Sequence, residues 1–316
     1  MAERWPALPY ETWKDTCQTL HLWTQIVGKV KLALSPEENH WWHVALAVTA
    51  GGLSTGPIPW NGPRRRIFEV RFDFVDHELL ILTSDGDVKA IPLVPRSVAW
   101  FYREFMECLA ALGIGVTINP LPSEIKSPIR CDQDESHASY DPEYANRFWR
   151  ILLEAAMVLR RHRSRFIGKC SPAHFFWGAF DLALTFFSGR RAPERVGADR
   201  MTREGYSHEV ISCGFWPGSE SFPEPAFYAY AAPEPPGLKV APVRPSAAFY
   251  HPQLNEFLLR YDDVRAADDP EQAILDFCGS TYEAGANLGK WDRDTLERHV
   301  KGEAPNAASA AGLSGQ

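Results

Sequence analysis

The stretch Phe166-Ile167-Gly168-Lys169-Cys170-Ser171-Pro172-Ala173-His174-Phe175-Phe176-Trp177 resembles an earlier stretch of the same chain. There, Ile26-Val27-Gly28-Lys29 is followed by Ser35-Pro36 and then by His40-Trp41-Trp42. Each copy comes after a long segment with helical periodicity and before a segment rich in strand-forming residues. The repetition therefore predicts two similar halves, and a seam between such halves is a frequent place for a small-molecule pocket.

The first half is expected to run helix, antiparallel strands, helix. Residues 10–34 have apolar side chains at three- and four-residue steps, which predicts a helix that Gly28 interrupts and Pro36 ends. Residues 66–75 alternate between apolar and charged side chains, which is typical of a half-buried antiparallel strand. The remaining predicted elements are strands at 41–50, 79–83 and 88–93, with a hairpin turn at Asp85-Gly86, and a helix at 97–112.

The second half has the same predicted order. Asp141-Pro142-Glu143 is a typical helix start, and the helix is expected to reach about Arg165. Another helix is expected to begin at Asp269-Pro270-Glu271 and to reach about Leu288. Between these helices the sequence predicts strands at 174–187, 207–215, 225–232 and 255–260, with an arginine-rich loop at 188–205 and a proline-rich loop at 233–247.

We therefore expect an α+β fold with two similar halves, each consisting of a helix, an antiparallel β-sheet and a helix, produced by internal duplication. The predicted division places an N-terminal repeat at 1–118, a linker at 119–140 and a C-terminal repeat at 141–295. Residues 296–316 are small and polar, so a disordered tail is expected there.

Composition limits the classes of function. The chain has 316 residues and a net charge of −7, which argues against non-specific binding to nucleic acid or to anionic lipid. No secretory signal and no run of about 18 apolar residues is present, so no membrane span is expected. The six cysteines form no CxxC pair, which fits reduced thiols and a cytoplasmic location.

The two Gly-Lys steps supply the first candidate site residues, Lys29 and Lys169. Neither step belongs to a phosphate-binding P-loop, because that motif needs a glycine where Trp23 and Arg163 stand. A lysine just after a helix commonly caps carbonyl groups or pairs with a carboxylate. Two symmetric copies nevertheless favour an anion contact at the seam.

Histidines supply the second set of candidates. His21 and Gln25 are expected on the same helix face as Lys29, and His40 and His174 hold matching places in the two copies. His208 and Glu209 are adjacent in a strand, so their side chains should point to opposite faces. His174 and Asp181 should also lie on opposite faces if the strand is regular, whereas a bulge at Gly178 would change that. No HxxxH or HExxH spacing supports a metal site, whereas a histidine suits acid-base chemistry near neutral pH.

Aromatic, cysteine and arginine residues complete the candidates. There are 11 tryptophans, of which Trp42, Trp177 and Trp216 are the candidates to line a pocket, although an aromatic core explains most of the rings. Cys170 follows Lys169 and precedes His174, but we expect it to be a small core residue. The arginines of 188–205 could recognise a carboxylate or phosphate, and solvated surface charge is the simpler explanation.

Several strings resemble a bacterial family catalogued as a domain of unknown function, family number 5996. They are Trp5-Pro6-Ala7-Leu8-Pro9-Tyr10, Thr19-Leu20-His21-Leu22-Trp23-Thr24-Gln25-Ile26-Val27-Gly28-Lys29, Asn39-His40-Trp41-Trp42, His137-Ala138-Ser139-Tyr140-Asp141-Pro142, Gly168-Lys169-Cys170-Ser171-Pro172, His174-Phe175-Phe176-Trp177-Gly178, Phe180-Asp181-Leu182-Ala183 and Ser207-His208-Glu209-Val210. The likeness extends from Trp5 to about Trp291. It implies a bacterial protein that stands alone, and it supplies no activity, cofactor or catalytic residue.

Three hypotheses follow for the function. The first is an enzyme-like pocket for a small molecule, in which His174, His208, Glu209 and Asp181 are the catalytic candidates and Lys169 holds an anion. The second is a non-catalytic binding module in which tryptophan rings stack on a sugar or a planar ligand. The third is a structural or partner-binding protein whose polar motif residues only fix the ends of strands and helices. The ligand-binding candidates are His21, Gln25, Lys29, His40, Trp42, Lys169, Trp177 and Trp216. The sequence does not indicate a cofactor, a substrate or an oligomeric state.

Overall fold

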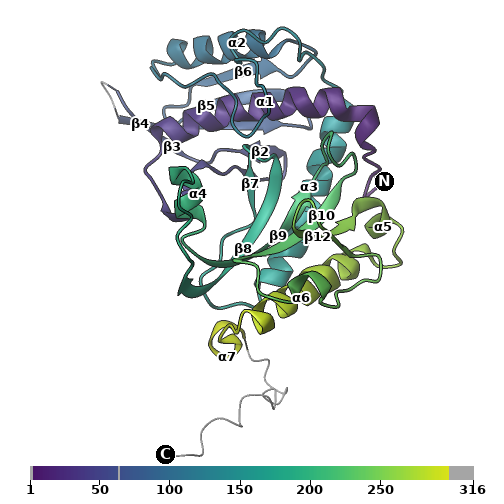
Figure 1. Ribbon diagram of the computed structural model, residues 1–316. Helices are drawn as coiled ribbons and strands as arrows, with labels where there is room; N and C mark the ends of the chain where they lie inside the picture. The colour runs from purple at the N-terminus through teal and green to yellow at the C-terminus, as the bar shows by residue number, and fades with distance from the viewer. Residues whose placement is uncertain (1–2, 63–64, 299–316) are drawn as a thin grey trace, which may run out of the picture.

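The computed structural model describes residues 3–62 and 65–298, and it confirms the α+β class. Helices pack on two antiparallel sheets, one from each half of the chain (Figure 1). The first half contains α1 (Tyr10–Leu34), η1 (Asn39–Val44), β1 (Ala47–Val48), β2 (Gly52–Ser54), β3 (Ile58–Asn61), β4 (Arg65–Asp73), β5 (Glu78–Thr83), β6 (Val88–Pro92) and α2 (Val98–Ala111).

The second half contains α3 (Pro142–Arg163), β7 (His174–Phe176), β8 (Asp181–Arg191), α4 (Arg200–Gly205), β9 (His208–Trp216), β10 (Ala226–Ala232), η2 (Leu238–Val240), β11 (Phe249–His251), β12 (Glu256–Arg260), α5 (Tyr261–Arg265), α6 (Pro270–Leu288) and α7 (Arg293–Leu296). The side chains of Asp141 and Asp269 accept hydrogen bonds from the first turns of α3 and α6, as their sequence predicts. Residues 299–316, which hold most of the expected tail, lie outside the described residues, whereas Leu296 ends α7.

Four local predictions are wrong. Residues 41–50 do not form one strand, because His40 and Trp41 have φ values of 56° and 62° and the chain forms η1 instead. Gly28 does not interrupt α1, since it adopts helical geometry in the middle of that helix. Residues 174–187 form two strands rather than one, because the chain reverses between β7 and β8, where Phe180 has a φ of 59°. The loop predicted at 188–205 is shorter than expected, because β8 continues to Arg191 and α4 occupies the end of the segment.

The two sheets have similar strand orders. The N-terminal sheet runs β1-β2-β4-β5-β6, with β3 also paired to β4, and the C-terminal sheet runs β7-β8-β9-β10-β12-β11. In each sheet most neighbouring strands are therefore consecutive in the chain, although β3 lies off the N-terminal path and β10 pairs with β12 rather than β11. Each sheet follows a long helix and precedes another. This correspondence agrees with two similar halves, and the duplication itself stays a prediction.

A backbone bridge joins the two sheets. The amide of Leu46 donates to the carbonyl of Phe175 at 2.8 Å, and the amide of Phe175 donates back to Leu46 at 2.9 Å. Leu46 lies just before β1 and Phe175 lies in β7, so the first strand of each half meets its counterpart. The bridge brings the chain after α1 beside the chain after α3.

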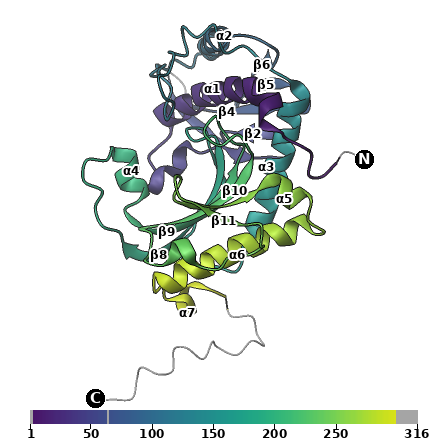
Figure 2. The same cartoon turned by 45° about the vertical axis from the view of Figure 1, so that its right-hand side comes forward.

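Helices cover one face of each sheet. Phe101 of α2 stacks on Trp23 of α1 at 4.8 Å and lies 6.4 Å from Phe72 of β4, so both helices cover the apolar face of the N-terminal sheet. The C-terminal sheet turns its apolar face toward α3 and α6 (Figure 2). Its core side chains include Phe186, Ile211 and Phe215, which belong to the main hydrophobic core.

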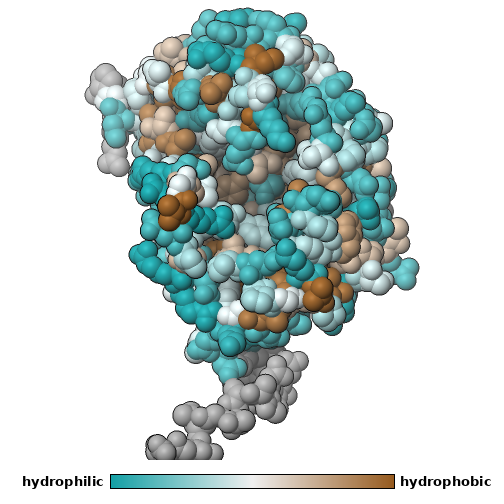
Figure 3. All heavy atoms as spheres, in the orientation of Figure 1, coloured by the Kyte–Doolittle hydropathy of each residue, from teal (hydrophilic) through white to brown (hydrophobic). Residues whose placement is uncertain are grey.

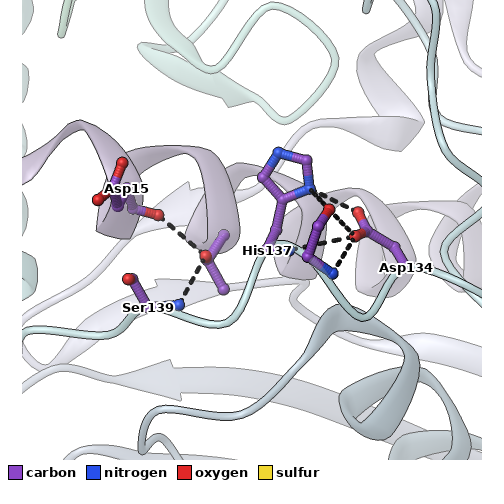
Figure 4. Close-up of polar contacts among 6 residues, drawn as sticks. Asp15, Asp134, His137 and Ser139 are labelled. Carbon is purple, nitrogen blue, oxygen red and sulfur yellow. Dashed lines mark hydrogen bonds and ion pairs between the residues drawn. The ribbon is translucent and has the colours of Figure 1, made fainter.

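The segment predicted as a linker, 119–140, contains no helix or strand and is fixed by polar contacts. The buried carboxylate of Asp134 accepts hydrogen bonds from Ser136 and from the backbone and ring of His137 (Figure 4). The hydroxyl of Thr19 in α1 donates to Asp15 O and accepts from the amide of Ser139. The string that begins at His137 therefore fastens this segment to α1 and to the start of α2.

Candidate functional site

The C-terminal sheet has a second face that no long helix covers. Strand alternation places on this face, which we call the open face, the side chains of Lys169, Ser171, His174, Phe176, Asp181, Ala183, Thr185, Phe187, His208, Val210, Ser212, Gly214, Trp216, Ala226, Tyr228, Tyr230, Ala232, Phe249, His251, Glu256, Leu258 and Arg260. Its apolar members form two small clusters that are separate from the main core. The molecular surface is hollowed beside α4 and below α1, where this face lies (Figure 3).

Five predicted site residues meet at one end of the open face: His40, Trp42, Lys169, His174 and His208. We call this group the basic cluster. The Nζ atom of Lys169 lies 2.7 Å from Nε2 of His40 and 5.6 Å from the centre of the Trp42 ring. The ring of His208 lies 5.7 Å from that of His40, and the ring of His174 lies 6.2 Å from that of Trp42.

The hydrogen bonds of His40 define its protonation. Its Nδ1 lies 3.2 Å from Gly205 O, a carbonyl that can only accept, and its Nε2 faces the ammonium of Lys169, which can only donate. His40 is therefore neutral, with the proton on Nδ1. Burial and the charge of Lys169 lower the pKa of His40, and burial lowers the pKa of Lys169.

No carboxylate among residues 3–62 and 65–298 forms an ion pair with the cluster. Lys169 forms no ion pair with any residue that the structure describes, and burial followed by the charges of Lys169 and Arg191 lowers the pKa of His208. The pKa of His174 is lowered to about 4 by burial and by the charges of Lys31 and Arg163. Its buried Nδ1 has no hydrogen-bond partner. The cluster therefore carries uncompensated positive charge that a ligand anion would relieve.

A cavity of about 260 Å³ occupies the other end of the open face. We call it the aromatic cavity. It is lined by Ala179, Asp181, Tyr206, Trp216, Tyr228, Tyr230, Leu254 and Glu256. Tyr228 and Tyr230 stack with their ring centres 6.2 Å apart, and the hydroxyls of Tyr230 and Tyr206 lie 2.9 Å from each other.

Gly214 makes room for the position of Tyr228. An ideal Cβ on Gly214 would lie 1.9 Å from the carbonyl oxygen of Leu182 and 2.6 Å from the Tyr228 hydroxyl, so any side chain there would clash with the neighbouring backbone and with the ring. Tyr228 therefore lies across β9 from β10 and donates its hydroxyl hydrogen to Oδ2 of Asp181 in β8. A glycine in the middle of a strand often marks such a close approach.

Both carboxyl groups of the cavity titrate well above their ordinary range. Burial raises the pKa of Asp181 to about 7, against the opposing effect of the Tyr228 hydroxyl, and the nearby Glu124 adds to the rise. Burial and the charge of Asp181 raise the pKa of Glu256 to about 7. Neither group forms an ion pair with a described residue.

The positions of Asp181, His208 and Glu209 test the predicted strand geometry. His174 and Asp181 lie on the same face, contrary to the prediction, because β7 and β8 form a hairpin in which His174 pairs with Ala183 and Phe176 with Asp181. His208 and Glu209 do point to opposite faces. Glu209 forms an ion pair with Arg190 at 2.6 Å, away from the open face. The structure therefore separates Glu209 from the other catalytic candidates.

The first-half candidates His21, Gln25 and Lys29 do not reach the open face. Gln25 forms a pair of hydrogen bonds with the backbone of Ser123, and Lys29 donates to the Ser123 hydroxyl at 3.2 Å. The Nε2 atom of His21 lies 2.9 Å from Gly178 O. Gln25 and Lys29 therefore fasten the segment after α2 to α1, and His21 fastens the turn between β7 and β8 to α1. Lys29 and Lys169 thus contact different parts of the molecule, contrary to the expectation of a shared anion contact at the seam.

Trp177 is also buried rather than exposed to a ligand. Its Nε1 donates to Val44 O at 2.8 Å, and its ring packs on Gly28 of α1 and beneath Lys29. Trp177 therefore has a structural role between the halves. Trp42 and Trp216 are half-buried, so these two rings remain able to contact a ligand.

Several arginines of the segment 188–205 have protein partners. Arg190 pairs with Glu209, and Arg200 pairs with Glu37 at 2.6 Å. The Arg195 guanidinium lies 3.9 Å from the centre of the Tyr206 ring. These contacts agree with a mainly structural role for the segment.

Sequence reasoning missed most of the aromatic cavity. Tyr228 and Tyr230 are two residues apart in a predicted strand, so their shared face was available from the alternation rule. Glu256 and Tyr206 gave no such signal, because their elements are distant in sequence and meet only through the order of strands in the sheet. Among the residues that the structure describes, no three His, Cys, Asp or Glu side chains gather as metal ligands.

The fold and the open face define an α+β protein with a charged and aromatic hollow on one sheet. Comparison of the sequence with known families shows that the chain belongs to the family of unknown function DUF5996, whose profile matches residues 5–298. No curated protein and no solved structure matches the chain. No described helix is long and apolar enough to cross a membrane. A bacterial source and a cytoplasmic location stay predictions.

Proposed function

We propose that the protein binds a small molecule on the open face of its C-terminal sheet and that the basic cluster holds an anionic group of this ligand. The observation that carries the proposal is the convergence of Lys169 with His40 and His208, without a described carboxylate, on an exposed sheet face. An anion is the partner that this arrangement lacks.

The Trp42 ring supports the same position for the ligand. Lys169 lies over the rings of both Trp42 and Phe187, with Nζ 5.0 Å from the centre of the latter. Cation–π contacts keep the ammonium group on the sheet while leaving its other side open. A phosphate or carboxylate placed there would receive hydrogen bonds from Lys169 and, after protonation, from the histidines.

Titration with inorganic phosphate tests the proposal, with binding followed by calorimetry. We expect Lys169→Met, which keeps the length of the side chain and removes its charge, to weaken phosphate binding at least about tenfold, or about 1.4 kcal/mol. The matched control is Lys126→Met at an exposed lysine, which should bind phosphate as the wild type does. Equal affinities of Lys169→Met and wild type would contradict the proposal.

The pH dependence gives a second readout that needs no variant. A bound anion stabilises the charged forms of His40 and His208, so binding of sulfate, an anion that does not itself titrate near neutral pH, should be accompanied by proton uptake below neutral pH. Lys169 and Arg191 are the basic side chains that lower the pKa of His208, and Lys169 also lowers that of His40. Calorimetry in buffers of different ionisation enthalpy measures the protons taken up.

General acid–base catalysis is the second candidate function. Its catalytic groups would be Asp181 and Glu256 rather than His174, because their pKa values of about 7 suit proton transfer at neutral pH, whereas the pKa of His174 is about 4. A bound ligand that is chemically converted by the wild type, and not by Asp181→Asn, would support catalysis. Recovery of an unchanged ligand would favour a binding module.

A further inference from the structure

The aromatic cavity contains two acidic groups and no basic one. Its eight lining residues include four aromatic side chains, Trp216 and three tyrosines, and the carboxyl groups of Asp181 and Glu256. At about 260 Å³ the cavity is smaller than most pockets for drug-sized molecules. It therefore suits a compact chemical group.

Elsewhere in this sheet, glutamates are paired with arginines. Glu224 and Arg260 form an ion pair at 2.5 Å, and Glu209 and Arg190 form one at 2.6 Å. Asp181 and Glu256 instead face the cavity, and neither forms an ion pair with a described residue. Asp181 is also near Glu124, a third acid, and Arg195, a described cation at the cavity, stacks on the ring of Tyr206 rather than pairing with an acid.

Rings and carboxylates together define the chemistry of the missing partner. The faces of tyrosine and tryptophan attract cations, and quaternary ammonium ligands are commonly held in aromatic cages. A neutral sugar would stack on the same rings, but it would not neutralise the acids. A calcium ion needs six or more oxygen ligands, and the cavity offers no cluster of three acidic or imidazole groups among the described residues.

We propose that the aromatic cavity binds an organic cation, with Asp181 and Glu256 neutralising an ammonium group that the four rings enclose. Lys169, His40 and Trp42 of the basic cluster lie beside Phe187, whereas His174 pairs with Ala183, two residues from Asp181. Phe187 is six residues along β8 from Asp181, a distance of about 20 Å at the usual strand rise. The cation site therefore does not depend on the anion site of the proposed function, and either can fail without the other.

Choline and its neutral isostere 3,3-dimethyl-1-butanol provide the sharpest pair of probes, with methylammonium as a smaller cation. Calorimetric titration should show that choline or methylammonium binds, and that the neutral alcohol binds at least about tenfold more weakly than choline. Binding of the alcohol as tightly as choline, or no binding of either cation, would overturn the proposal.

Proton release is a test on the unmodified protein. The two carboxyl groups are partly protonated near pH 7, and a bound cation favours their ionised forms, so choline binding should release protons at that pH. The other titratable or charged groups around Asp181 and Glu256 come from several elements. Glu124 would act in the same direction, and the tyrosines 206, 228 and 230, whose pKa values are raised by burial, stay neutral. His251 is the cross-strand partner of Glu256 in β11, and the Arg195 guanidinium stacks on Tyr206. Binding without proton release would count against the site.

Variants locate the binding in the cavity. Glu256→Gln and Asp181→Asn remove one charge each while keeping the shape of the side chain, and each should weaken choline at least about tenfold. Glu194→Gln, at an exposed glutamate outside the cavity, is the matched control and should leave the affinity unchanged. Choline affinity equal to the wild type in both cavity variants would exclude this site, and if the variants fail to fold, proton release from the wild type still decides.

Discussion

Replacing Gly28 by alanine should destabilise the protein even though it improves the helix propensity of α1. An ideal Cβ at this position would lie 2.3 Å from Nε1 of Trp177 and 2.4 Å from two of its ring carbons. Non-bonded carbon atoms prefer about 3.5–4.0 Å, so the indole must move by about 1 Å. Trp177 is buried and donates a hydrogen bond to Val44 O, so the indole cannot move without disturbing neighbouring side chains or breaking this hydrogen bond.

Three contributions set the expected magnitude. Overpacking of a buried site costs about 1–3 kcal/mol. Separation of the Trp177 N–H from Val44 O leaves a buried donor without a partner, at about 1–3 kcal/mol. The higher helix propensity of alanine offsets about 1 kcal/mol of this loss of stability. The net expectation for Gly28→Ala is a loss of about 3 kcal/mol, measured as the free energy of unfolding in urea.

Gly279→Ala is the matched control, because Gly279 also lies inside a helix and nothing lies within 4 Å of its ideal Cβ. There we expect a gain of about 0.5–1 kcal/mol from helix propensity alone. A Trp177→Leu background should remove most of the cost at Gly28 but not the gain at Gly279. The reasoning is refuted if Gly28→Ala is as stable as the wild type or more stable.

Two further predictions concern buried acids. Burial raises the pKa of Asp181 from 3.8 to about 7. Between pH 3.8 and about pH 7 the folded chain therefore keeps a proton on Asp181 that the unfolded chain has lost. The contribution of Asp181 to the free energy of unfolding consequently falls as the pH rises through this range. Asp181→Asn should therefore stabilise the protein more at about pH 8 than at about pH 5 in urea unfolding, and an equal effect at both would show that Asp181 is not desolvated. Asp134→Ala should cost about 3 kcal/mol, since it leaves the donors of Ser136 and His137 without their buried acceptor. Asp132→Ala, which removes only an exposed pair with Arg130, should cost about 0–1 kcal/mol, and similar losses for both would contradict this role of Asp134.

The long helices could be predicted from the sequence because their periodicity and caps are local. Asp141-Pro142 and Asp269-Pro270 begin α3 and α6 where the rules for N-caps place them. The segment after α1 could not be predicted in the same way. His40 and Trp41 take left-handed backbone conformations, and His40 is held there by contacts with Lys169 and Gly205, which are distant in sequence.

The candidate site was predicted in part for a similar reason. Motif matching selected His40, Trp42, Lys169, His174 and His208, and the structure places all five at one end of the open face. The same matching also selected His21, which contacts Gly178, and Lys29, which contacts Ser123. No local sequence pattern reveals either of these distant partners. The carboxyl group of Glu256 meets Asp181 only because β12 lies beside β10 in the sheet, which is a property of strand order rather than of spacing.

The backbone bridge between Leu46 and Phe175 also bears on the exposure of the border strands of the two sheets. A short strand at the border of a sheet normally offers unpaired amides and carbonyls to neighbouring molecules, which invites aggregation. Here β1 and β7 are the border strands of their sheets, and each helps to shield the other through these two hydrogen bonds. Each half thus covers part of the border strand of the other half. A fragment that contained only one half would expose the unpaired backbone groups of its border strand to solvent.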